Sequence, residues 1–150
     1  MRAEPYLLFN GRCEEALAFY ENAIGAATMM VTHFDQSPEP PRQPLPPQWG
    51  HKIMHAVLKI GDTLVMVSDG VGGADPVFAG FALSITADDE DRAKRVFDAL
   101  ADGGNVGLAL GRSVWSPLFG MVTDRFGVTW MVSAEPRESA AREVDQRSQA

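Results

Sequence analysis

The chain has 150 residues, of which 45% are hydrophobic and 22% are charged, and it contains a single cysteine, Cys13. This length suits one domain or two very small ones, and the composition excludes disordered, collagenous and disulfide-stabilised proteins. The net charge of -7 disfavours binding to nucleic acid. No apolar run approaches the roughly 18 residues that span a bilayer, and the first residues do not resemble a signal peptide. We therefore expect a cytoplasmic protein that binds neither nucleic acid nor membranes.

The first half of the chain predicts one strand, one helix and three more strands. Residues 6–9 form an apolar run that ends in an Asn10-Gly11 turn. Residues 15–24 then place their apolar side chains on one helical stripe, and Gly25 stands where a helix C-cap is typical. Three strand-like segments follow, at residues 28–34, 52–60 and 63–68.

The second half repeats this pattern. Residues 81–85 predict a strand, and Thr86 to Asp89 offers a capping box for a helix that ends before Gly103-Gly104. Three strand-like segments follow again, at residues 106–110, 118–123 and 129–133. The halves differ mainly in residues 36–49, a proline-rich stretch that predicts an extended surface loop in the first half only.

The repeat predicts the fold class. Each unit has one amphipathic helix that can cover one face of its sheet. We predict an α+β fold in which two fused βαβββ units form a curved mixed sheet with the helices outside and a ligand groove inside. Residues 1–134 are assigned to a single domain with repeats at about 4–70 and 78–134, and residues 135–150 to a polar C-terminal tail.

Several stretches resemble one protein superfamily. Residues 6–11 (YLLFNG) and 15–20 (EALAFY) resemble the opening of vicinal-oxygen-chelate proteins, the glyoxalase, bleomycin-resistance and extradiol-dioxygenase superfamily. Residues 54–56 (MHA), 67–69 (VSD) and 119–131 are similar to its PhnB-like branch, also labelled 3-demethylubiquinone 3-methyltransferase-like. The resemblance covers about residues 4–134. It implies the paired-unit fold and a homodimer.

In the superfamily's metal enzymes, four strands supply the ligands. The resemblance places these positions near Pro5 or Tyr6, at Met66 to Ser68, at Gly80 to Leu83 and at Trp130 to Val132. None of these stretches contains His, Glu or Asp, whereas a divalent cation needs nitrogen or oxygen donors. We therefore expect no metal and no other cofactor. The methyltransferase label has no independent support, because no Gly-x-Gly loop follows a strand in a parallel unit.

His55 is the candidate catalytic residue. Its neighbours Met54, Ala56 and Leu58 make the more apolar face of the strand, so His55 is expected to face the groove together with Ile53 and Val57. An imidazole there can donate or accept a proton near pH 7. The alternative is a hydrogen-bonded structural histidine. His51 would stand about 13 Å away along the strand, too far to share a metal ion with His55, and His33 would not complete a ligand set.

We predict that a ligand-binding set lines the groove. Its members are the strand positions named above and the large side chains of the second half: Tyr6, His55, Met66, Ser68, Trp115, Phe119, Met121 and Trp130. Aromatic side chains with a polar tip suit planar or amphipathic small molecules. Core packing or a dimer interface is the alternative for the large residues of the second half.

Three further residues have two interpretations each. Asp69 and Asp124 follow strands beside glycine-containing turns, and turn formation explains both without a general-base role. Cys13 lies at a predicted helix N-terminus, where the helix dipole can lower a thiol pKa. The alternative for Cys13 is a partly buried thiol without a role.

The sequence therefore leaves three hypotheses about function. The preferred one is a metal-independent protein of the PhnB-like branch that binds an unidentified small molecule. The second is a glyoxalase- or dioxygenase-related enzyme with a non-standard centre that uses His55 as an acid or base. The third is a structural or interaction module that acts as a homodimer.

Overall fold

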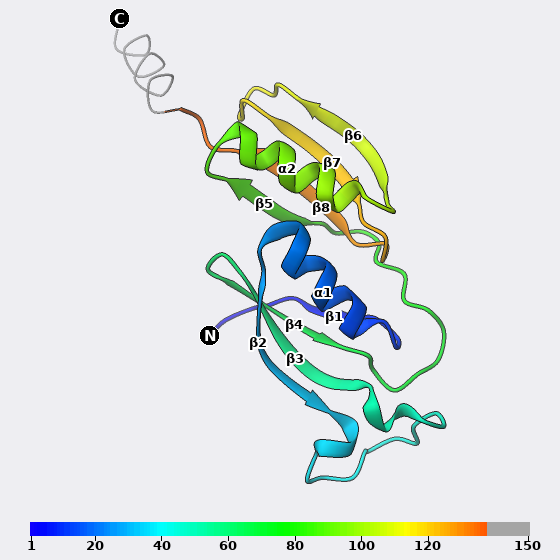
Figure 1. The fold of residues 1–150 in the computed structure, drawn as a ribbon. Helices are drawn as coiled ribbons and strands as arrows, with labels where there is room; N and C mark the ends of the chain where they lie inside the picture. The colour runs from blue at the N-terminus through cyan, green and yellow to red at the C-terminus, as the bar shows by residue number, and fades with distance from the viewer. Residues whose placement is uncertain (138–150) are drawn as a thin grey trace, which may run out of the picture. The chain divides into compact units, whose positions relative to one another are not determined.

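The computed structural model describes residues 1–137 and divides the chain into two compact units, with the boundary between Val77 and Phe78 (Figure 1). This boundary lies between the two predicted repeats. Most of the predicted polar tail, residues 138–150, lies outside the described residues. Within residues 1–137, no helix has the length and apolar character required to cross a membrane.

The first unit contains one helix and a four-stranded mixed sheet. Its elements in chain order are β1 (Tyr6–Leu8), α1 (Cys13–Ile24), β2 (Ala27–His33), β3 (Ile53–Ile60) and β4 (Thr63–Ser68), with short 3₁₀ turns at Phe34–Gln36 and Trp49–His51. The strand order is β1-β4-β3-β2. β1 runs parallel to β4, and the other pairs are antiparallel.

The second unit repeats this topology. Its elements are β5 (Leu83–Ala87), α2 (Glu90–Ala101), β6 (Asn105–Gly111), β7 (Phe119–Thr123) and β8 (Thr129–Ala134). The strand order is β5-β8-β7-β6, with β5 parallel to β8 and the other pairs antiparallel. The predicted α+β class and βαβββ repeat are confirmed, and the strands form two four-stranded mixed sheets.

In each unit the helix covers one face of the sheet (Figure 1). In the first unit, the row Leu7, Val67 and Ala56 is joined by strand pairing and is buried. The apolar stripe of α1 is buried with it, at Ala16, Leu17, Tyr20 and Ile24. Because side chains alternate along a strand, the neighbouring row projects from the opposite face.

The carboxylate of Asp69 holds three separate segments of the first unit together. Its Oδ1 accepts hydrogen bonds from the backbone N–H groups of Gly11 at 2.7 Å and Cys13 at 2.8 Å. Its Oδ2 accepts one from the N–H of Ile53 at 2.8 Å. Arg12, the N-cap residue of α1, makes no side-chain cap, so Asp69 satisfies the first helical N–H from a distant strand end.

The start of α2 is capped locally instead. Asp89 is the N-cap residue, and its side chain accepts a hydrogen bond from the N–H of Arg92 at 2.7 Å. The predicted capping box over Thr86 to Asp89 is therefore one turn too early, because Thr86 belongs to β5. The strand pairing of Thr86 with Ser133 fixes it in the sheet.

We predict that Asp69→Asn lowers the free energy of unfolding by about 2–4 kcal/mol. An amide that keeps its oxygen toward Gly11 and Cys13 presents its NH₂ group to the N–H of Ile53, which places two donors against each other. Urea denaturation followed by circular dichroism measures the change. Asp62→Asn, at the exposed β3–β4 turn, is the matched control. Equal stability of the two variants would contradict this role of Asp69.

Candidate functional site

One row of side chains crosses all four strands of the first sheet on the face away from α1. Strand pairing joins Tyr6 to Met66, Met66 to Val57, and Val57 to Met30. Tyr6 is 47% exposed and Met30 is 49% exposed. We call this row, together with His55, the first-sheet face. It offers two thioethers and a phenol to a ligand without any rearrangement of the core.

Tyr6 and His55 form the polar part of the first-sheet face. The Tyr6 hydroxyl and His55 Nδ1 lie 3.3 Å apart, within hydrogen-bond distance, and the ring centroids are 5.7 Å apart. If the hydroxyl donates to Nδ1, the proton of a neutral imidazole resides on Nε2. The contact joins β1 to β3 across β4, so two of the predicted ligand residues meet in one place.

A β-bulge changes which side chains of β3 share the face of His55. Ile53 and Ala56 are both buried, although three positions along a regular strand would place them on opposite faces. The pairing with β2 shifts between Thr32 and His33, which leaves Met54 without a partner. The prediction is therefore wrong for Ile53 and Met54, since Ile53 enters the core and Met54 lies outside it beside His55.

Three predicted ligand residues of the second half also lie close together. Trp115 is 66% exposed and packs edge-on against Phe119, with ring centroids 5.6 Å apart. Met121 pairs with Met131 across β7 and β8, on the face opposite the buried row of Val122 and Trp130. These residues form an aromatic and thioether patch within the second unit.

Trp130 and Ser68 have structural partners. Trp130 is 1% exposed, and its Nε1 donates to Asp124 Oδ2 at 2.8 Å. The other oxygen of Asp124 accepts hydrogen bonds from the turn N–H groups of Phe126 and Val128. Ser68 is also buried, and its Oγ accepts from the N–H of Gly70 at 2.9 Å. Neither Trp130 nor Ser68 contributes to the exposed surface of its unit, and we leave both out of the site.

The stretches that the resemblance places at the superfamily's ligand positions offer no His, Asp or Glu to a divalent metal. Within residues 1–137, the His, Cys, Asp and Glu side chains form no group of three or more that could hold an ion. His33 Nδ1 instead lies 3.1 Å from the amide oxygen of Gln36, and His55 contacts Tyr6. We therefore derive no chemical step through a metal.

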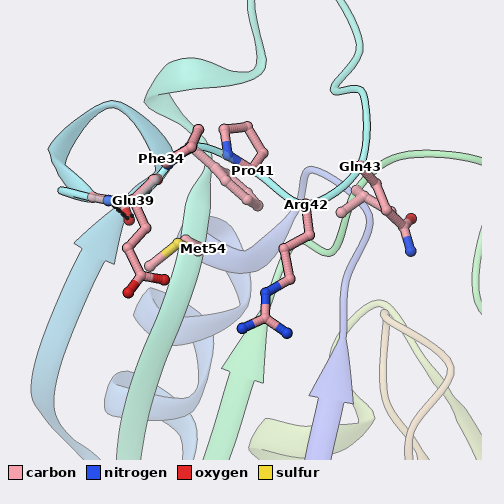
Figure 2. A pocket seen from close by; sticks show the side chains of 9 residues that line it. Phe34, Glu39, Pro41, Arg42, Gln43 and Met54 are labelled. Atoms are coloured by element: carbon pink, nitrogen blue, oxygen red, sulfur yellow. Dashed lines mark hydrogen bonds between the residues drawn. The ribbon is translucent and has the colours of Figure 1, made fainter.

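A cavity lies beside the proline-rich stretch, for which the sequence predicts an extended surface loop. It has a volume of about 310 Å³ and is lined by Phe34, Ser37, Glu39, Pro40, Pro41, Arg42, Gln43, Met54 and Val71. The sequence feature that could have indicated this cavity is Glu39-Pro40-Pro41-Arg42, in which two conformationally rigid prolines separate opposite charges. We call this cavity the loop pocket; Figure 2 shows it from close by.

Of the two interpretations of Cys13, the structure supports the buried thiol. Cys13 is fully buried, and burial, followed by the negative charges of Asp69 and Glu14, raises the pKa of its thiol far above the usual value. The helix N-terminus does not overcome these effects. Cys13 is thus a core residue and an unsuitable nucleophile.

We predict that wild-type protein loses stability, relative to Cys13→Ala, as the pH rises above about 8.5. The folded state keeps the thiol protonated, whereas the unfolded chain releases the proton, so high pH favours unfolding by up to about 1.4 kcal/mol per pH unit. Urea denaturation of both proteins between pH 7 and pH 10 measures the difference. A constant difference over this range would contradict the raised pKa.

Comparison with known proteins supports the same fold and family. The model of the Glyoxalase/Bleomycin resistance protein/Dioxygenase superfamily matches residues 2–132. Protein YjdN of Escherichia coli (strain K12) is 32% identical over 139 residues, which cover 89% of this chain and 95% of YjdN.

Solved structures of similar proteins have the same fold. PA1353 from Pseudomonas aeruginosa is 40% identical with a TM-score of 0.78, covering 90% of this chain and 98% of PA1353. The PhnB protein from Bacillus cereus is 23% identical with a TM-score of 0.75, covering 90% of this chain and all of that one, and it supports the fold alone. Together with the βαβββ repeat, the family model and the match to YjdN show that the chain belongs to the Glyoxalase/Bleomycin resistance protein/Dioxygenase superfamily, in which it is similar to YjdN.

Proposed function

We propose that this protein binds a small planar or amphipathic molecule on the first-sheet face, without a metal ion. The observation that carries the proposal is the Tyr6–His55 pair, which places a hydroxyl and an imidazole on the same face as the exposed Met30 and the half-buried Met66. An apolar surface with a few convergent polar groups is the usual composition of a ligand site.

The chemistry of the face favours a neutral or weakly charged aromatic ligand that bears oxygen. Methionine side chains adapt to a ring and make favourable sulfur–aromatic contacts. The Tyr6 hydroxyl and His55 Nε2 can donate to or accept from an oxygen substituent. The site lies in a protein of net charge -7, which disfavours highly charged anions.

We predict that phenol and 4-hydroxybenzoate shift the Met30 and Met66 resonances of protein labelled with ¹³C in the methionine methyl groups. Methyl NMR spectra recorded during the titration measure binding and report where it occurs. Tyr6→Phe and His55→Gln remove polar partners from the exposed face and should weaken binding at least about fivefold, the effect of roughly one hydrogen bond.

The control for this experiment is His51→Gln, which changes an exposed histidine outside the face. Binding of both probes with unchanged affinity in Tyr6→Phe and His55→Gln would contradict the proposed site. The absence of any shift at Met30 and Met66 with both probes would contradict it as well.

The Tyr6–His55 contact also favours a second candidate function, proton transfer by His55. In the tautomer in which the Nδ1–H of His55 donates to the Tyr6 oxygen, Nε2 is unprotonated and available to a substrate, the arrangement that a general base requires. Such an enzyme abstracts a proton beside a carbonyl of a small oxygenated substrate.

We predict that wild-type protein accelerates deuterium uptake from D₂O into dihydroxyacetone and that the His55→Ala variant does not. If wild type and His55→Ala give equal deuterium uptake, or if wild type gives no more uptake than buffer alone, proton abstraction from dihydroxyacetone by His55 is excluded.

We also propose that the chain acts in the cytoplasm as a homodimer. The outer strands of the two sheets, β2 and β6, carry exposed apolar side chains at Met29, Met30, Val106 and Leu108. An exposed strand edge with apolar side chains is a template for pairing with a second copy.

A further inference from the structure

We propose that the loop pocket is a second binding site, and that it takes a small zwitterion with an apolar body, of the class of an apolar α-amino acid. The pocket shares no lining residue with the first-sheet face, so this inference is independent of the function proposed above. Its volume of about 310 Å³ lies at the lower end of the range of small-molecule sites.

The loop pocket carries two opposite charges that do not neutralise each other. Glu39 and Arg42 both line it, and Figure 2 shows the carboxylate and the guanidinium well apart, with Met54 between them in this view. Within the described part of the chain, neither side chain forms an ion pair. Both charges are therefore available to a ligand.

The residues between the two charges explain why they stay apart. Pro40 and Pro41 each have a fixed φ near -65°, and the residue before a proline is held in an extended conformation. The chain therefore cannot close the tight turn that would bring Glu39 and Arg42 together. Charges held in place before binding cost less conformational entropy when the ligand arrives.

The loop is fastened at its ends, which keeps the pocket in shape. The indole Nε1 of Trp49 donates to the carbonyl of Gly70 at 2.9 Å, and Nζ of Lys52 donates to the carbonyl of Gly11 at 2.9 Å. Pro46 packs so closely on Gly72 that a side chain at Gly72 would collide with it. At the other end, the N–H of Phe34 donates to the carbonyl of Lys52 at 3.1 Å.

The remaining lining determines the class of ligand. Phe34, Met54 and Val71 offer apolar surface, while Arg42 suits a carboxylate and Glu39 suits an ammonium group. An α-amino acid with an apolar side chain presents all three features on a single carbon. A plain anion or a plain cation would satisfy only one charge and leave the other without a partner.

We test the proposal with L-phenylalanine as the probe, using the ¹³C-methyl resonance of Met54, assigned with Met54→Leu. L-Phenylalanine should shift this resonance saturably, with a Kd of about 1 mM, because ion pairs with solvent-exposed charges contribute little binding free energy. Phenylacetate and phenethylamine, which each carry one of the two charges, should bind at least about fivefold more weakly. Arg42→Gln and Glu39→Gln should each weaken L-phenylalanine binding to a similar degree.

Arg95→Gln, an exposed arginine on α2 in the other unit, is the matched control and should bind like wild type. His55→Gln should also bind L-phenylalanine like wild type, which separates this site from the first-sheet face. The proposal is overturned if L-phenylalanine leaves the Met54 resonance unchanged, if Arg42→Gln or Glu39→Gln binds it as tightly as wild type, or if either single-charge probe binds equally well.

Discussion

The Asp69 carboxylate is the interaction on which the first unit depends. It accepts N–H groups from the β1–α1 turn, from the first turn of α1 and from the first residue of β3. The β3 segment is far from the other two in sequence, and without Asp69 the N–H groups of Cys13 and Ile53 would be buried donors that lack this acceptor. One side chain thus fixes the position of the helix relative to the sheet. Cys13, the first residue of the helix, is fully buried beside it.

This constraint also shapes the candidate site. Asp69 binds β3 at Ile53, the first residue of the strand and the one next to the bulge. With Ile53 held in the core, the extra residue of the bulge places Met54 and His55 together outside it. Met54 then lines the loop pocket and His55 contacts Tyr6, so the two proposed binding surfaces include neighbouring residues of one strand.

Much of the fold could be predicted from the sequence because its signals are local. The apolar periodicity of each helix and Gly25 at the end of α1 act within a few residues of the structure they specify. The bulge at Met54 could not be predicted from local signals, and the residue beside it, Ile53, is bound by a carboxylate sixteen positions downstream. The sequence left the pKa of the Cys13 thiol open between two interpretations for the same reason, because burial and the charge of Asp69 are long-range effects. Trp130 was predicted as a groove residue from its size and its strand position, and neither of these reveals the hydrogen bond from its indole to Asp124.

The central claim is that the chain binds a small organic molecule without a metal, and native mass spectrometry of the protein purified without added ligand tests it most directly. The measurement reports oligomer mass, bound metal and co-purified small molecules together. The account predicts a metal-free dimer that carries an organic adduct, and that the adduct is lost on acidification. One stoichiometric divalent metal ion per chain would contradict it.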